Sequence, residues 1–237
     1  PVSAFMKLRD LQPRFLLESV EGGERLARYS FLGFGAASTV RLEHNDLYLD
    51  EKVIGQPKSQ IEYLQSLREL LSVAPQLTPS IDDLPFSGGL VGVSGYDIIR
   101  LFEELPALTK PQENLPRAIF VMPTSVLVFD HLTRRAALLH AGSETARKQL
   151  KQQVIQCLRA SLPVDEEPSS FTEPEAQMSE VEFLRRVEQC KKWIDSGDIY
   201  QIVLSVVFKG QSNVDSFEVY RALRLLNPSP YMFYFDF

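Results

Sequence analysis

Short apolar segments separated by turn residues make up the first quarter of the chain. They cover residues 14–20, 27–32, 37–43 and 46–54. The connections between them contain Gly22-Gly23, Gly33-Phe34-Gly35 and His44-Asn45. Short connections rich in glycine and asparagine are typical of hairpins between antiparallel strands. The pattern therefore predicts an antiparallel meander.

Four later segments carry apolar residues at helical spacing. They are residues 59–73, 143–162, 179–196 and 215–226. Ser179 and Asp215 each stand three residues before a glutamate, which is the spacing of an N-terminal helix cap. We expect helices over these ranges, the last of them ended by the Asn227-Pro228 pair, because proline cannot continue a helix.

Further strands are expected between and after these helices, at residues 86–97, 117–130, 135–141, 198–208 and 231–237. Strands and helices in this mixture indicate an α+β fold. Residues 163–177 hold three prolines and five acidic residues without a basic one. This segment is predicted to be an acidic linker or surface loop between residues 1–162 and residues 178–237.

The net charge of the chain argues against some classes of binding partner. The chain has 25 lysines and arginines against 31 acidic residues, a net charge of −6, which argues against nucleic acid or an anionic membrane as a partner. No apolar run approaches membrane-spanning length and no signal peptide opens the chain. The two cysteines, Cys157 and Cys190, fall in predicted helices. We therefore expect a cytoplasmic protein without disulfides.

Four glycines at positions 88, 89, 92 and 95 lie within a strand-like pattern. Glycine-rich loops can bind phosphate through their backbone amides. The spacing here fits neither the dinucleotide nor the P-loop fingerprint, and no lysine follows the last glycine. A bulge or a close approach of another backbone is the favoured interpretation.

The apolar stretch Phe15-Leu16-Leu17-Glu18-Ser19 places a carboxylate and a hydroxyl side by side. Adjacent side chains of a strand face opposite ways, so one of Glu18 and Ser19 should face inward and need a partner. A bound ligand is one candidate for that partner; a solvated strand end, with no buried group, is the alternative.

The last seven residues, 231–237, are unusually apolar. Five of them are aromatic and no polar tail follows, so the pattern predicts a fragment.

Several motifs, taken in order, resemble the large subunit (component I) of anthranilate synthase, a chorismate-binding enzyme family. They are the LLES stretch (Leu16-Leu17-Glu18-Ser19), Arg28-Tyr29-Ser30-Phe31, Gly88-Gly89-Leu90-Val91-Gly92 with Tyr96-Asp97, residues 197–205, and the NPSPYM stretch (Asn227-Pro228-Ser229-Pro230-Tyr231-Met232). The resemblance covers nearly the whole chain and matches the N-terminal half of that family. It implies an α+β sandwich of two packed antiparallel sheets with helices outside.

The resemblance also implies an activity and partners. The family converts chorismate to anthranilate and pyruvate, using Mg²⁺ and ammonia from a glutaminase (amidotransferase) subunit, and L-tryptophan inhibits it as the end product. Its magnesium and chorismate ligands lie after the NPSPYM stretch, so we assign no metal site here and expect these 237 residues to be inactive alone. Residues 1–162 would then be a regulatory domain, and residues 178–237 would begin the chorismate-binding region.

In this family the LLES and NPSPYM stretches form the tryptophan pocket. Carried over, the pocket holds Leu17, Glu18, Ser19, Asn227, Pro228, Pro230, Tyr231 and Met232, with Arg28 as a further wall. The residue types suit the ligand, because tryptophan offers an ammonium, a carboxylate and a flat indole that need acceptors, donors and apolar surfaces. The pattern of residues 227–232 also predicts the end of a helix followed by a core strand, and this structural role is compatible with a role in the pocket.

Two positions bear on the reaction. Related enzymes that add water to chorismate have a lysine base where this chain has Gln201, and an amide cannot act as a general base, so Gln201 favours the ammonia-using branch. The family usually has Gln-Arg after Ser205, whereas this chain has Val206-Val207, which removes several hydrogen-bond donors.

Two other functions are alternatives to an anthranilate synthase large subunit. They are an aminodeoxychorismate synthase component and a non-catalytic amino-acid-binding module.

Overall fold

The computed structural model describes residues 1–19, 28–106, 115–162 and 169–237. The predicted turn at Gly22-Gly23 and the start of the acidic linker lie outside these residues. The chain forms two compact units: Pro1–Val164 together with Arg221–Phe237, and Asp165–Tyr220. The domain boundaries expected from the sequence stay a prediction.

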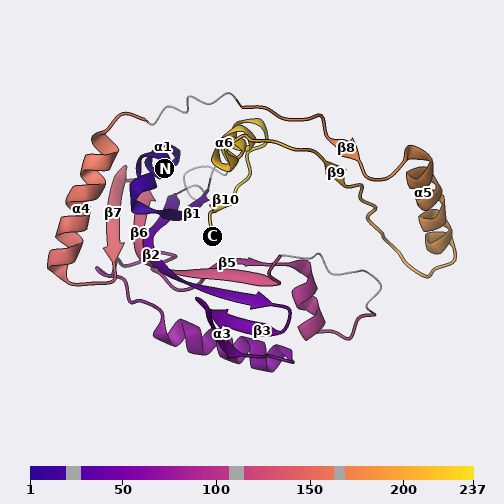
Figure 1. Cartoon of the computed structure of the whole chain (residues 1–237), viewed down its shortest axis with the longest axis horizontal. Helices are drawn as coiled ribbons and strands as arrows, with labels where there is room; N and C mark the ends of the chain where they lie inside the picture. The colour runs from indigo at the N-terminus through magenta and orange to yellow at the C-terminus, as the bar shows by residue number, and fades with distance from the viewer. Residues whose placement is uncertain (20–27, 107–114, 163–168) are drawn as a thin grey trace. The chain divides into compact units, whose positions relative to one another are not determined.

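The first unit is built on an eight-stranded antiparallel sheet (Figure 1). Its strands are β1 (Pro13–Glu18), β2 (Tyr29–Glu43), β3 (Asp46–Leu49), β4 (Lys52–Gly55), β5 (Val91–Ser94), β6 (Ala118–Asp130), β7 (Arg135–His140) and β10 (Met232–Phe235). One edge of β2 pairs with β6, and the other edge pairs first with β1 and then with β3. The predicted 117–130/135–141 hairpin is confirmed by the pairing of β6 with β7.

Helices pack against this sheet. They are α1 (Val2–Lys7), the 3₁₀ helices η1 (Arg9–Leu11) and η2 (Tyr96–Leu101), α3 (Gln60–Val73), α4 (Glu144–Arg159) and the part of α6 (Ser216–Leu226) from Arg221 onward. The N-termini of α3 and α4 are capped by the hydroxyls of Ser59 and Ser143. No helix among the described residues is long and apolar enough to cross a membrane.

Among the described residues, two clusters of the hydrophobic core lie near opposite ends of the long β2–β6 pair. The first joins Tyr63 and Leu70 of α3 to Leu42 and Leu47 of the sheet. The second is centred on Phe15, which is fully buried. The described residues thus form a mixture of helices and strands with one large antiparallel sheet, and the predicted two-sheet sandwich is not seen among them.

The first meander differs in detail from the sequence prediction. Residues 27–32 and 37–43 were expected to be two strands, but the single strand β2 runs from Tyr29 to Glu43 and takes in the described part of both ranges apart from residue 28. Gly35 has a φ of 80° and lies where the register with β6 shifts, so the glycines make a bulge instead of a turn. Residues 46–54 form the tight hairpin β3–β4 instead of one strand, with Asp50 at a φ of 53°.

The second unit holds α5 (Glu180–Asp195), the two-residue strands β8 (Glu175–Ala176) and β9 (Phe208–Lys209), and the start of α6. The helix prediction is confirmed, since the Ser179 hydroxyl caps α5. The strand predicted at residues 198–208 is wrong: only its last residue belongs to a strand. A β-branched run forms a ladder only beside another strand, and here the described partner, β8, is two residues long.

Gly92 illustrates why glycine occurs in this sheet. A Cβ atom built there would lie 2.0 Å from the backbone oxygen of Ile119 and 2.6 Å from Cα of Phe120 on β6. The close-approach interpretation of the glycine series is therefore confirmed at this position. Gly88 and Gly89 instead have positive φ angles of 124° and 110°.

Arg28, just before β2, forms an ion pair with Asp130 at the end of β6. The Nη2 to Oδ2 distance is 3.0 Å, and the guanidinium also lies over the Tyr29 ring, 4.7 Å from its centroid. The hydrogen bond from Arg28 and those from the backbone of the following turn lower the pKa of Asp130 to about 2. This contact fastens the ends of two central strands.

The Gly92→Ala substitution should lower the free energy of unfolding by about 1–3 kcal/mol, since the added methyl group must displace the backbone of β6. Urea denaturation followed by circular dichroism measures the loss. Gly55→Ala is the matched control, because no atom lies within 4 Å of a Cβ built there. Equal stability of the two variants would contradict the close approach of β5 to β6.

Replacing Arg28 by glutamine should raise the pKa of Asp130 from about 2 towards its ordinary value of 3.8. Because the pKa of Asp130 is lowered in the folded state, its contribution to stability is complete above pH 3.8 and is lost as the pH falls through about 2. Carboxyl ¹³C NMR follows both states. The pKa of Glu182, held at about 2 by Arg185 and Arg186, is the internal control and should not move.

Candidate functional site

The two motifs that lie over two hundred residues apart in the sequence meet in the sheet. β1 and β10 pair antiparallel, with Glu18 opposite Met232 and Leu17 opposite Phe233 (Figure 1). The hydroxyl of Ser19 donates a hydrogen bond to the backbone oxygen of Pro230 at 2.8 Å. The LLES and NPSPYM stretches are therefore neighbours, as the family resemblance implied.

A row of directly opposed residues crosses four strands at this point. Met232 of β10 faces Glu18 of β1, Glu18 faces Ser30 of β2, and Ser30 faces Phe129 of β6. Directly opposed residues point to the same face of a sheet, and α1 covers this face through Phe5, whose ring packs edge-on against Tyr234. Glu18 thus points to the side of the sheet that α1 covers.

Glu18 is the inward-facing polar group that the sequence predicted. Its side chain is only 2% exposed. Nε of Arg224, on the last turns of α6, donates a hydrogen bond to its Oε2 at 3.1 Å. The expectation that a ligand supplies the partner of Glu18 needs correction, because a protein cation already pairs with this carboxylate. An ionised carboxylate is costly to bury unless it is paired and hydrogen-bonded.

Sequence reasoning missed Arg224, although a signal was present. A carboxylate predicted to face inward calls for a cation, and Arg224 stands three residues before the NPSPYM stretch. The predicted helix 215–226 ends beside that stretch, so its last turn had to approach the LLES stretch once the two motifs paired. The pairing of the motifs therefore implied Arg224 as a neighbour.

Beside Glu18, Ser30 forms a second polar pair. Its side chain is buried, and its hydroxyl lies 2.8 Å from Nε2 of His131. Partial burial lowers the pKa of the His131 imidazole from 6.5, although the residue as a whole stays exposed. The ring is therefore mainly neutral at pH 7 and adds little charge beside Glu18.

The remaining predicted pocket residues differ in exposure. Asn227, Pro230 and Tyr231 are exposed, and Tyr231 keeps 75% of its surface accessible. The half-buried members are Leu17, Ser19, Pro228 and Met232. Arg28 is also half-buried, but its guanidinium pairs with Asp130. The site therefore offers apolar surface to solvent beside a buried ion pair.

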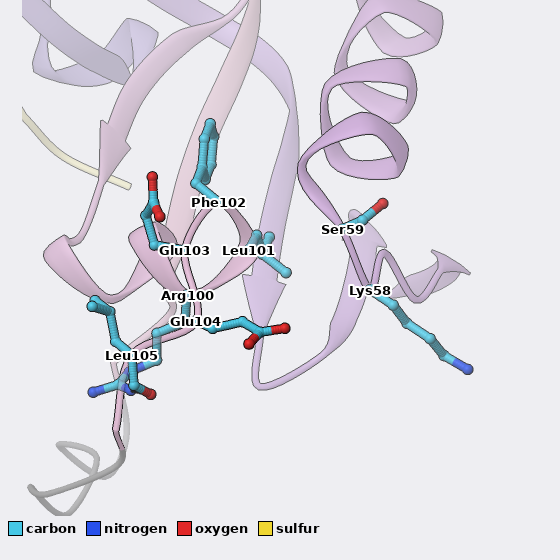
Figure 2. Close-up of a pocket in the computed structure, with 8 residues that line it drawn as sticks. All are labelled: Lys58, Ser59, Arg100, Leu101, Phe102, Glu103, Glu104 and Leu105. Atoms are coloured by element: carbon cyan, nitrogen blue, oxygen red, sulfur yellow. Dashed lines mark hydrogen bonds between the residues drawn. The ribbon is translucent and has the colours of Figure 1, made fainter.

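A separate hollow of about 450 Å³ lies between the start of α3 and the end of η2 (Figure 2). It is lined by Lys58, Ser59, Arg100, Leu101, Phe102, Glu103, Glu104 and Leu105. Charged groups of both signs surround it, and the Lys58 ammonium points away from the other side chains. Arg100 is already bound to Asp97 and to the Leu105 carbonyl oxygen. No residue of the predicted pocket lines this hollow.

Gln201 lies in the second unit, where it is exposed in an irregular segment after α5. Val206 is half-buried and Val207 exposed, and the carbonyl oxygen of Val207 accepts a hydrogen bond from the amide of Gln177 at 2.7 Å. Over the described ranges, no three His, Cys, Asp or Glu residues come together as a possible metal site.

Curated proteins similar to this chain share one description. Anthranilate synthase component 1 of Thermus thermophilus is 35% identical over 240 residues, covering 100% of this chain and 50% of that protein. Its counterpart in Synechocystis is 35% identical over 270 residues, covering 100% of this chain and 51% of that protein. The chain thus spans about half the length of these relatives.

A solved structure and a family model agree with these relatives. Anthranilate synthase component I from Streptococcus pneumoniae has a TM-score of 0.68 and 29% identity, over 86% of this chain and 46% of that one. The family model described as chorismate binding enzyme matches residues 12–237. The chain therefore belongs to the chorismate-binding enzyme family.

Proposed function

We propose that the full-length protein is anthranilate synthase component I, which converts chorismate and ammonia to anthranilate and pyruvate. The observation that supports this most strongly is that curated component I proteins match the whole of this chain at up to 35% identity. These residues would be its N-terminal half, and the second half would complete the two-sheet sandwich. A glutaminase subunit would supply the ammonia.

We further propose that the β1–β10 junction is the feedback site for L-tryptophan. The pairing of the LLES and NPSPYM stretches and the bond from Ser19 to Pro230 support it. The exposed rings of Pro230 and Tyr231 give the indole stiff apolar faces, and Met232 adapts to its edge. Backbone and hydroxyl groups at Ser19 would orient the amino-acid end of the ligand.

The catalytic parts would lie mostly outside these residues. Bound Mg²⁺ would stabilise negative charge on the chorismate carboxylate. The described residues contain no cluster that fits such an ion, so we place its ligands in the remaining half of the protein. Gln201 would influence the choice of nucleophile. Its neutral amide cannot deprotonate water, so ammonia would be the effective nucleophile.

The full-length protein, supplied with chorismate, an ammonium salt and Mg²⁺, should form anthranilate and pyruvate in equal amounts. Anthranilate fluorescence and a coupled pyruvate assay measure the two products. The 237-residue chain under the same conditions should form neither. Formation of an aminodeoxychorismate without pyruvate would instead support the sister enzyme, and turnover by the 237-residue chain would contradict our placement of the catalytic residues.

Ser19→Ala should weaken the binding of L-tryptophan to the folded chain about fivefold, because the bond that joins the two stretches is lost and one hydrogen bond contributes about 1 kcal/mol. Glu18→Ala should weaken it more, since it leaves Arg224 without its partner. Isothermal titration calorimetry measures the affinities. Ser72→Ala, at an exposed position of α3, is the matched control and should bind as the wild type does. Unchanged affinity in both site variants would remove these residues from the pocket.

A further inference from the structure

We infer that Arg224 is the residue that recognises the ligand's α-carboxylate, and that Glu18 is a positioning residue that holds Arg224. The inference rests on the proposed amino-acid site at the β1–β10 junction. It assigns the two charged groups different tasks from those the sequence suggested, where Glu18 was expected to meet the ligand directly. Three features of the Glu18–Arg224 ion pair support this inference.

The first feature is the difference in exposure within the pair. The Glu18 side chain is 2% exposed, whereas the Arg224 side chain is 32% exposed. Arg224 therefore presents surface to solvent that Glu18 does not. A ligand that arrives from solvent meets the guanidinium before it meets the carboxylate.

The second feature is the way in which Arg224 uses its donors. A guanidinium has five N–H donors arranged as a fork. Arg224 donates from Nε to Oε2 of Glu18. Among the residues that the structure describes, neither Nη atom of Arg224 has a hydrogen-bond partner. The outer edge of the guanidinium, where two parallel donors match a carboxylate, is thus available for a ligand.

The third feature is the charge of the surroundings. An α-amino acid carries an ammonium and a carboxylate on the same carbon, so a site with both signs of charge close together complements it better than a single charge. Glu18 balances Arg224, and the N-terminal ammonium of Pro1, whose pKa burial lowers, lies close enough to interact with both; the nearby His131 is mainly neutral because partial burial lowers its pKa. Glu18 also fixes the guanidinium in one orientation, which reduces the entropy that ligand binding would otherwise cost.

The test compares L-tryptophan with tryptamine, which keeps the indole and the ammonium but lacks the carboxylate. Calorimetric titration of the wild-type chain should show a preference for L-tryptophan of roughly tenfold to a hundredfold, the effect of a hydrogen bond to a charged group. Arg224→Gln should weaken L-tryptophan binding by that factor and leave tryptamine binding within about twofold. A purely structural role of Arg224 would weaken both ligands equally.

Arg224→Gln removes a cation from beside the buried Glu18 carboxylate, so the variant is paired with the double substitution Glu18→Gln with Arg224→Gln, which removes the buried charge as well. The double variant should show the same loss of preference. Arg147→Gln on α4, which removes a half-buried arginine paired with Glu144, is the control and should keep the wild-type preference. If the wild type does not bind L-tryptophan, the proposed function fails and this inference with it; if it does and the double variant keeps the preference, the inference alone is wrong.

Discussion

The ion pair between the buried Glu18 and the half-buried Arg224 is the interaction on which the candidate site depends. It joins a strand near the start of the chain to a helix 206 residues later, across a distance of 3.1 Å. Burying an ionised carboxylate is costly unless it is paired and hydrogen-bonded, so this contact favours the arrangement with both elements in place. Because the NPSPYM stretch begins three residues after Arg224, the same contact holds that stretch near β1.

The sheet supplies the rigidity that this contact needs. β1 lies between β2 and β10, and its fully buried Phe15 belongs to the core cluster that β6 and β7 complete. Gly33 on β2 makes room for the Phe15 ring, since a Cβ there would lie 2.1 Å from it. The polar row through Glu18 and Ser30 lies on the opposite face from Phe15, because adjacent strand positions alternate. One strand thus anchors the core with one face and presents the site with the other.

The sequence predicted the parts of this fold that local physics decides. The amphipathic helices α3 and α5, the Ser179 cap of α5 and the β6–β7 hairpin were confirmed, because caps, periodicity and turn residues are local signals. The continuity of β2 and the absence of a strand at residues 198–208 were missed, since both depend on which strand lies alongside. In the site, the family resemblance of the motifs predicted that the LLES and NPSPYM stretches lie side by side. The Glu18–Arg224 pair needed the structure, because no local pattern specifies a partner 206 residues away.

The central claim is that an amino acid binds where β1 meets β10, and hydrogen exchange of the backbone amides, followed by mass spectrometry with and without L-tryptophan, tests it most directly. A ligand at this junction stabilises the edge strand β10 and the strand beside it. The account predicts slower exchange in Met232–Phe235 and Pro13–Glu18 at saturating ligand, with no change in α3. Exchange that is unchanged at the junction, or slowed only around the hollow beside η2, would contradict it.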